Sequence, residues 1–459
     1  MKKTNIIFIL ADDMGYGDFG KFSRGNAITP NLDKMADEGV CLTQCYAESP
    51  VCTPSRAAIL TGRYHHRTGA IDMRELRGLS RMSLKETTIA DIFKMNGYAT
   101  GLIGKWHNGT IGDKYHPNAR GFDTFVGFRG GMSAYYDWNL YYNGEMKKSD
   151  GRYLTDVFTD ESIKFINDHK NGPFFLNIAY NAPHSPLEAP EEDIKIFSER
   201  GLYTRGVSAT YAMILCMDRG IGKIFDELKR LGIDEDTLVL FTSDNGPQFG
   251  GQGEMRTDRF NCELAGSKGV VYEGGIKVPC VIRQPGRIVG GAFNNCFAHG
   301  TDWLPTLAAA ADIKIPENIR IDGQNIFGQI TGEQDFGEVK RFWQWNRYDP
   351  MVTCNAAMRD GAWKLVRPPI PEAMTVIRED FDIDRIVEKN PEAYPEIINP
   401  PMSARVLPPP APPKLYDLEA DPFEQNDLAA VYPERVSEML KELEEWFNEV
   451  ETERRSITE

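Results

Sequence analysis

Four short apolar runs alternate along the chain with segments of helical periodicity, and this alternation constrains the fold more than any other feature. Such runs are typical of strands buried on both faces of a parallel sheet. Strands alternating with helices predict a doubly wound α/β fold, with a large, mostly parallel sheet between helices. The predicted strands are Ile6–Leu10, Ala99–Ile103, Phe174–Ala179 and Leu238–Thr242. The predicted helices run from a cap at Thr29–Asn31 to Gly39 and over 85–96, 155–169 and 207–231.

Polar side chains follow each predicted strand directly. Ligands of open α/β sheets bind beyond the carboxyl ends of the strands, so the four clusters are expected to converge on one site. Strand-end Asp and Asn often only cap turns. Four clusters in corresponding positions nevertheless favour a functional site. The polar residues of interest are Asp12, Asp13, Lys105, His107, His184, Asp244 and Asn245.

The stretch Cys52-Thr53-Pro54-Ser55-Arg56 is predicted to open a helix. Pro54 suits a first helical turn, Ala57–Leu60 are helix formers, and Gly62 is a plausible C-terminal stop. Cys52 would then lie at a helix N-terminus, where the dipole favours negative charge. Arg56 follows one turn later and points back towards residue 52. This setting favours a reactive cysteine over a packed core thiol.

The run from Cys52 to Arg63 resembles the Cys-x-Pro-Ser-Arg…Thr-Gly-Arg signature of type I sulfatases, which belong to the alkaline phosphatase superfamily. In that family the cysteine is converted after translation to formylglycine, whose hydrated gem-diol is the nucleophile. The resemblance extends over nearly the whole chain. Gly266–Gly275 is similar to the family's Gly-Lys-Gly…Glu-Gly-Gly stretch, and Leu415–Pro422 resembles a pattern near the family's end.

Oxygen-bearing side chains at two strand ends predict a metal site. Carboxylate and amide oxygens suit a hard cation, Ca²⁺ or Mg²⁺, rather than zinc. The resemblance points to one Ca²⁺, which would also contact the modified Cys52. The cation would act as a Lewis acid on the ester. The predicted ligands are Asp12, Asp13, Asp244, Asn245 and the modified Cys52.

The resemblance also implies roles for five polar residues. Arg56 would neutralise the gem-diol as it loses its proton. Lys105 and Lys268 would bind sulfate oxygens and stabilise charge in the transition state. His107 would assist the nucleophile and the later elimination, and His184 would protonate the leaving alcohol. Either histidine could be the general acid, because both titrate near neutral pH.

Other residues receive weaker interpretations. Asn108 stands where many relatives carry leucine, which should alter a pocket wall. His65 and His66 could line the substrate mouth or form a surface turn. Asp18 and Asp33 are interpreted as turn or capping residues, Cys41 and Cys45 as packed core. His116, His169 and His299 are expected to be structural or exposed. Trp345, Asn346 and Arg347 could grip a sugar, although core packing is the more common role.

The net charge of −15 over 459 residues argues against nucleic-acid binding, which needs a cationic surface. An anionic substrate therefore needs a local positive site. No apolar run approaches a membrane span. Eight cysteines without Cys-x-x-Cys pairs suggest free thiols in a reducing compartment. Residues 2–10 lack the length and cleavage site of a signal peptide. We expect a cytoplasmic protein, or a periplasmic or secreted one if a leader was removed.

The pattern changes near residue 335, which predicts a catalytic domain over 1–335 and a C-terminal subdomain over 336–459. Residues 368–413 hold twelve of the 28 prolines and are expected to form an extended, polyproline-like wrap. An amphipathic helix is predicted over Pro433–Glu453. A small antiparallel sheet is predicted from Phe342–Trp345, Ala356–Met358, Trp363–Val366 and Leu415–Leu418, with a turn at Asp360-Gly361.

The resemblance therefore implies a sulfatase that hydrolyses a sulfate monoester of a carbohydrate after a maturase has converted Cys52. One alternative is a phosphonate monoester or phosphodiester hydrolase of the same superfamily that uses the same nucleophile. A second is an unconverted protein that binds sulfated glycans without turnover. A cysteine phosphatase is disfavoured, because its loop needs Cys-x5-Arg and Cys52 and Arg56 are spaced Cys-x3-Arg.

Overall fold

The structure is a computed structural model that describes residues 3–75, 77–335, 337, 340–389, 394, 396–398 and 405–458. A ten-stranded sheet forms its centre, in the order β10-β2-β9-β8-β1-β7-β3-β4-β5-β6. The strands are β1 (Asn5–Ala11), β2 (Val40–Tyr46), β3 (Ala99–Lys105), β4 (Thr124–Phe128), β5 (Asn139–Tyr142), β6 (Glu145–Lys148), β7 (Phe174–Ala179), β8 (Thr237–Ser243), β9 (Cys280–Arg283) and β10 (Ala292–His299).

The four predicted strands are the four central ones. They run side by side as β8-β1-β7-β3, and each neighbouring pair is parallel. The pairs of β9 with β2 and β8, and of β5 with β4 and β6, are antiparallel, so the sheet is mixed but mostly parallel at its centre. The predicted α/β fold class is confirmed. The carboxyl ends of the four central strands meet at one edge of the sheet, where the candidate site lies.

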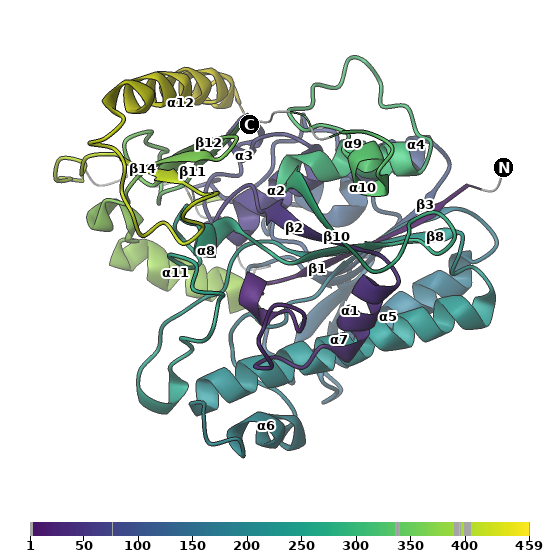
Figure 1. Cartoon of the computed structure of the whole chain (residues 1–459). Helices are drawn as coiled ribbons and strands as arrows, with labels where there is room; N and C mark the ends of the chain where they lie inside the picture. Colours follow the sequence, from purple (N-terminus) through teal and green to yellow (C-terminus); the bar gives the residue numbers. More distant parts are fainter. Residues whose placement is uncertain are drawn as a thin grey trace.

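Helices cover both faces of this sheet (Figure 1). Ile7 and Ile9 of β1 belong to the core under α1 (Pro30–Asp37), α5 (Leu154–His169) and α7 (Arg205–Leu231). The alternate side chains of β1, including Phe8, belong to the core under α2 (Cys52–Thr61), α4 (Ile89–Met95), α9 (Trp303–Ala310) and α10 (Phe327–Thr331). Successive strand residues face opposite sides, so a continuous apolar run serves both cores. Short helices are α3 (His65–Thr68), α6 (Glu191–Ser198) and α8 (Glu273–Ile276).

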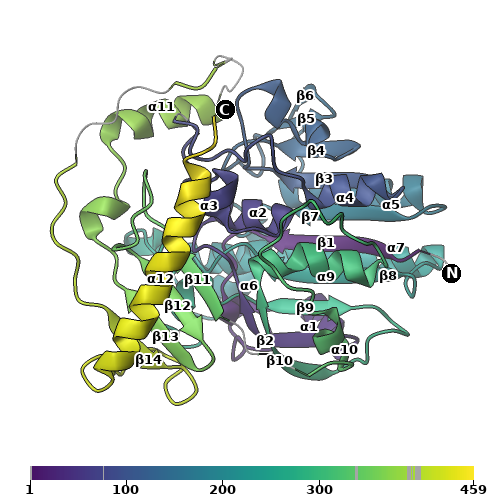
Figure 2. The same cartoon turned by 90° about the horizontal axis from the view of Figure 1, so that it is seen from above.

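A second, antiparallel sheet lies beside the first and carries the C-terminal helix on its outer side (Figure 2). Its order is β11-β12-β13-β14, with α12 (Pro433–Arg454) packed against it through Leu443 and Trp446. This confirms the predicted small sheet and terminal helix. The strands are β11 (Lys340–Gln344), β12 (Ala356–Asp360), β13 (Trp363–Arg367) and β14 (Lys414–Asp417).

The proline-rich segment differs from its prediction. An extended wrap was expected over 368–413, but α11 (Arg378–Lys389) lies within it. Residues 378–389 contain no proline and place apolar side chains at helical spacing, so the local sequence outweighs the composition of its surroundings. Residues 405–413 carry no helix or strand, as expected. The remaining part of the prediction, 390–393, 395 and 399–404, lies outside the described residues.

Short 3-10 helices join several of these elements. They cover Tyr16–Asp18, Asp113–Tyr115, Pro117–Ala119, Gly253–Met255, Gly300–Asp302 and Pro371–Met374. Among the helices of the described ranges, none combines the length and the apolar character that a membrane crossing needs.

Candidate active site

The ends of β1 and β8 bring four oxygen-bearing side chains together. The two strands pair in parallel up to Ala11 and Ser243, so Asp12 and Asp244 follow at the same level. The Asp13 amide donates to Asp244 Oδ1 at 3.2 Å, and Asn245 Nδ2 donates to Asp13 Oδ1 at 2.8 Å. The structure therefore brings together the predicted ligand residues, as the parallel sheet requires.

Helix α2 starts at Cys52 and ends at Gly62, whose φ of 68° is the left-handed conformation of a helix stop. One turn after Cys52, Arg56 Nε donates to Asp244 Oδ2 at 2.8 Å. Arg56 Nη1 also donates to the Lys105 carbonyl at 3.2 Å. The buried Arg56 thus connects the helix carrying Cys52 to the ends of β8 and β3.

Two lysines approach the acidic pair that follows β1. Lys105 Nζ donates to Asp12 Oδ2 at 2.7 Å, and Lys268 Nζ lies 2.7 Å from Asp13 Oδ1. The Lys105 side chain is fully buried and that of Lys268 is 10% exposed. Buried charges require such partners. Burial opposes ionisation of Asp13, but Lys268 and His184 outweigh it and hold the pKa of Asp13 below its ordinary value.

Two histidines complete the site. His184 Nδ1 donates to the Ser185 carbonyl at 2.7 Å, and His184 Nε2 lies 3.7 Å from Asp13 Oδ2. Burial, and then the charge of Lys268, lowers the pKa of His184 to about 3. Burial and the charge of Lys105 likewise hold the pKa of His107 well below its ordinary value. Both shifts disfavour the protonated imidazoles.

Burial also determines the state of the unmodified Cys52 thiol. It raises the pKa of Cys52, and the nearby charges of Lys105 and Lys268 offset this only in part. Burial therefore outweighs the helix N-terminus that the sequence suggested would favour a thiolate.

The donor set fits a hard cation. Asp12 Oδ1 and Asn245 Oδ1 are buried and have no hydrogen-bond partner. Buried acceptors without a partner are unfavourable unless a ligand satisfies them. Burial and the neighbouring Asp12 raise the pKa of Asp244 to about 6, although Arg56 opposes the shift. Three carboxylates and an amide oxygen are the ligands that Ca²⁺ and Mg²⁺ prefer.

His65 and His66 do not lie where either prediction placed them. Both are buried, and their rings are 3.9 Å apart. His65 Nδ1 lies 2.8 Å from Glu48 Oε1, and His66 Nε2 donates to Gln344 Oε1 of β11 at 2.9 Å. Neither residue is at a surface turn or a substrate mouth. The sequence carried no sign of this, because Glu48 and Gln344 are distant along the chain.

The core interpretation holds for the Trp345 segment, because Trp345 and Asn346 are buried. Cys41 and Cys45 are also buried, and all eight cysteines are free thiols. Asp18 stabilises a turn, as predicted, because its Oδ2 accepts a hydrogen bond from the Gly15 amide at 2.8 Å. It also forms an unpredicted buried ion pair with Arg259.

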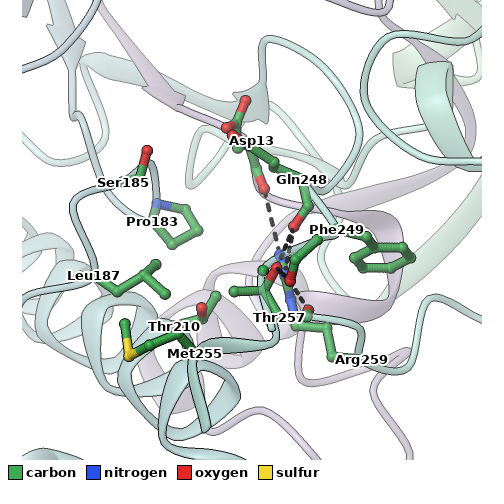
Figure 3. Close-up of a pocket in the computed structure, with 12 residues that line it drawn as sticks. Asp13, Pro183, Ser185, Leu187, Thr210, Gln248, Phe249, Met255, Thr257 and Arg259 are labelled. Carbon is green, nitrogen blue, oxygen red and sulfur yellow. Dashed lines mark hydrogen bonds between the residues drawn. The ribbon is translucent and has the colours of Figure 1, made fainter. Parts of the chain in front are cut away.

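A cavity of about 130 Å³ opens next to Asp13 (Figure 3). Pro183 and Ser185, which flank His184, line one side, and the loop from Gln248 to Arg259 lines the other. The cavity thus adjoins the charged cluster at Asp13. None of the residues of this loop was singled out from the sequence, because they follow no strand directly.

A sequence model of the sulfatase family matches residues 4–313 of this chain. The chain belongs to the sulfatase family. It is 30% identical to mouse arylsulfatase J over 97% of its own length and 76% of that protein. It is 31% identical to human arylsulfatase A over 96% of its length and 87% of that protein. Sulfatases are sulfuric ester hydrolases, so this chain is an enzyme of that class.

Solved structures agree with the assignment. Ps i-CgsB, crystallised in complex with k-i-k-neocarrahexaose, superposes with a TM-score of 0.80 at 29% identity, covering 97% of this chain and 93% of that one. The phosphonate monoester hydrolase of Agrobacterium radiobacter superposes with a TM-score of 0.63 at 20% identity. The second likeness shows a shared fold only.

Proposed function

We propose that this sulfatase hydrolyses a sulfate monoester of a carbohydrate and that a formylglycine derived from Cys52 is its nucleophile. The observation that carries the proposal is the position of Cys52 at the start of α2, among the charges of Lys105, Lys268 and Arg56. Two relatives support the carbohydrate: the human N-acetylgalactosamine-6-sulfatase, 32% identical over 70% of this chain, and Ps i-CgsB.

The chain's residues divide the reaction between them. One hydroxyl of the hydrated residue 52 releases its proton to solvent as its oxygen attacks sulfur, the bond from sulfur to the alcohol oxygen breaks, and protonated His184 gives that oxygen a proton. The second hydroxyl then loses its proton to His107, the bond from carbon to the sulfate oxygen breaks, and sulfate leaves. Water adds to the resulting aldehyde and restores the gem-diol. Lys105 and Lys268 stabilise charge on the sulfate oxygens throughout.

The lowered pKa of His184 is compatible with this acid role. A bound sulfate ester brings negative charge close to His184 and partly offsets Lys268, which raises the pKa of His184 towards the working range. The hydrogen bond from Nδ1 to the Ser185 carbonyl holds the ring so that Nε2 faces the site. Nε2 is therefore the atom that would carry the transferred proton.

Asp12, Asp13, Asp244 and Asn245 would hold a Ca²⁺ ion, the metal that the family resemblance implies. When bound, the cation supplies Lewis-acid polarisation of the ester. Its arrival would satisfy the unpartnered oxygens Asp12 Oδ1 and Asn245 Oδ1. A separate maturase is the second partner that the family resemblance implies, because the Cys52 thiol must be oxidised to an aldehyde before it can form a gem-diol.

We also propose a division near residue 335, with a catalytic domain over 1–335 and a C-terminal subdomain over 336–459. The change from the ten-stranded sheet to the four-stranded sheet supports this boundary. The hydrogen bond from His66 to Gln344 joins the two parts.

The test is expression with and without a maturase, followed by intact-mass analysis of the peptide holding residue 52. Converted protein should hydrolyse nitrophenyl sulfate and sulfated sugars, and Cys52→Ala should lower turnover by orders of magnitude at unchanged fold. Substantial activity in Cys52→Ala would overturn the mechanism. A preference for phosphodiesters in the unchanged enzyme would instead favour the phosphoester alternative. Binding of sulfated glycans without any turnover would indicate a binding protein.

A further inference from the structure

The loop that carries Lys268 is irregular and runs over 266–272 between β8 and α8. Lys268 Nζ nevertheless has a defined place, 2.7 Å from Asp13 Oδ1, and under the proposed function it binds the sulfate oxygens. An irregular loop has no ladder of hydrogen bonds to fix its own backbone. The position of the Lys268 ammonium group therefore depends on the contacts that hold this loop.

The catalytic domain supplies two of these contacts. The Lys268 amide donates to the carbonyl of Pro247, in the segment that follows β8, at 3.0 Å. The Gly269 amide donates to the Pro50 carbonyl at 2.9 Å, two residues before Cys52. The loop is thus fastened to the segments that carry the metal-ligand candidates and the nucleophile.

The second sheet supplies two more contacts through the side chain of Asn355, which lies just before β12. Asn355 Nδ2 donates to the Gly269 carbonyl at 2.9 Å, and Asn355 Oδ1 accepts from the Val271 amide at 3.1 Å. Nδ2 also donates to the Trp345 carbonyl at 2.7 Å. Asn355 is fully buried. One amide side chain therefore satisfies a backbone acceptor and a backbone donor on either side of residue 270.

The backbone conformation at position 355 also suits asparagine. Its φ of 49° lies in the left-handed region, which Asn adopts more readily than most residues. Asp tolerates this conformation but lacks the N–H donor, and Gly lacks the side chain. Trp345 packs on the same loop, because a Cβ added to Gly269 would lie 3.7 Å from Trp345 Cζ3. The second sheet thus contacts the Lys268 loop through a hydrogen-bonded clamp and an aromatic ring.

Resting on the proposed function, we propose that Asn355 is a positioning residue that sets the place of Lys268. The second sheet then takes part in sulfate binding, although Asn355 itself is buried beneath the loop's backbone contacts. Loss of the clamp leaves the Gly269 carbonyl and the Val271 amide without their buried partners, so the loop has to move to satisfy them. A shift of about 1 Å in a catalytic group can lower the rate by about a hundredfold.

The experiment is a double-mutant cycle between Asn355→Gly and Lys268→Ala in converted, metal-loaded enzyme, with nitrophenyl sulfate as substrate. Asn355→Gly keeps the left-handed backbone accessible and removes both arms of the clamp. It should lower kcat/KM by about tenfold or more when Lys268 is present. In the Lys268→Ala enzyme the same change should lower kcat/KM by less than about twofold, because no ammonium group remains to be positioned.

Inhibition by inorganic sulfate gives a second measurement that a purely structural role would not affect. Asn355→Gly should raise the inhibition constant of sulfate by about threefold or more, since the displaced Lys268 binds sulfate oxygens less well. Asn355→Asp keeps the acceptor for the Val271 amide and tolerates the backbone conformation. It should also lower kcat/KM in a manner that depends on Lys268, and it serves as the test if Asn355→Gly fails to fold.

Asn5→Ala is the matched control. Asn5 is a second buried asparagine whose side chain bridges neighbouring segments: Nδ2 donates to Thr237 Oγ1 and Oδ1 accepts from the Phe174 amide, each at 3.3 Å. These contacts lie at the amino ends of β1, β7 and β8, opposite the site. Asn5→Ala should lower the melting temperature and leave kcat/KM and the inhibition constant of sulfate unchanged.

The outcomes separate this inference from the proposed function. Equal losses of kcat/KM for Asn355→Gly with and without Lys268 would overturn the positioning role and leave the sulfatase mechanism intact. An unchanged inhibition constant of sulfate in Asn355→Gly would overturn it as well. Converted, unmutated enzyme that hydrolyses no sulfate ester would instead contradict the proposed function.

Discussion

The molecule contains two buried clusters, each of which combines acidic and basic side chains. The site cluster contains Asp12, Asp13, Asp244, Arg56, Lys105 and Lys268. The joint cluster contains Tyr46, Glu273, Arg359, Lys364 and Glu424 and connects the first sheet to the second. In the joint cluster, Lys364 Nζ lies 2.8 Å from Glu273 Oε1 and 2.9 Å from Glu424 Oε1. Tyr46 donates to Glu273 Oε2 at 2.8 Å.

The clusters differ in what surrounds them. The site cluster lies at the ends of β1 and β8, beside a cavity. The joint cluster packs between two sheets, where Arg359 also donates to the Tyr46 hydroxyl. Burial and charge alone therefore do not distinguish a reaction site from a structural contact. The neighbouring cavity does, since each cluster contains one buried carboxylate oxygen without a hydrogen bond, Asp12 Oδ1 in the first and Glu424 Oε1 in the second.

Removal of the metal should have the largest effect and should act on the site cluster only. Chelation should abolish sulfatase activity, and it should lower the melting temperature, because a ligand of the folded state alone stabilises it. Asp13→Asn should mimic chelation in activity, since Asn also tolerates the φ of 67° at this position. Asp33→Asn, in the first turn of α1, is the control. Full activity in excess chelator, with no metal by elemental analysis, would refute the metal site.

Removal of the proposed acid should have a smaller effect, and one that depends on the substrate. His184→Ala should lower kcat/KM for sulfated sugars by about 10²- to 10⁴-fold, because sugar alcohols need protonation to leave. It should affect nitrophenyl sulfate much less, since nitrophenol leaves as an anion. Steady-state kinetics on both substrates provide the measurement. Equal losses on the two would move the acid role to His107 or another residue.

Disruption of the joint cluster should have the opposite effect: it should lower stability and leave activity intact. Lys364→Met leaves Glu273 and Glu424 buried without their shared cation, and should lower the free energy of unfolding by about 3–5 kcal/mol. Activity per folded molecule should persist. Urea unfolding measures the first quantity and active-site titration the second. Lys340→Met, which removes an exposed pair with Glu442, should change stability by less than about 1 kcal/mol. A Lys364→Met enzyme that is stable but inactive would break the comparison.

The buried His66, which is hydrogen-bonded to Gln344 of the second sheet, should make the free energy of unfolding modestly dependent on pH. Burial, and then His65, holds the pKa of His66 well below its ordinary value, so the unfolded chain binds the extra proton. Stability should therefore be fully present above about pH 6.5 and fall as the pH decreases. His66→Gln should flatten this slope by about 1.4 kcal/mol per pH unit in urea unfolding between pH 6 and 4.5. His169→Gln, at the end of α5, is the matched control for the loss of an imidazole.

The sequence predicted the centre of the fold well because local patterns encode it. The apolar runs of β1, β3, β7 and β8 are long and uninterrupted, so burial on both faces follows from them alone. The flanking strands β9 and β10 escaped prediction. Cys280–Arg283 has only four residues, and Ala292–His299 interrupts its apolar residues with Asn294 and Asn295 and buries only its second half. Such segments are defined by the neighbour with which they pair, and not by their own composition.

The candidate site shows the same division. Asp12, Asp244 and Cys52 were identifiable because each adjoins a recognisable strand or helix. Arg259 and its partner Asp18 were not, because their contact joins residues 241 positions apart and neither lies in a distinctive motif. The predicted position of His65 was wrong for a related reason, because only the folded structure shows that His65 contacts Glu48. Contacts between distant residues determine these roles, and periodicity does not report them.

The pairing of Asp12 with Lys105 and of Asp13 with Lys268 has a consequence for the order of assembly. Three carboxylates and three cationic side chains give the site cluster a formal charge of zero. A divalent cation would make it +2, and a sulfate dianion would return it to zero. Cation and sulfate should therefore strengthen each other's binding by the same factor, as thermodynamic linkage requires. In a chain of net charge −15, the enzyme would acquire affinity for its anionic product only together with its metal.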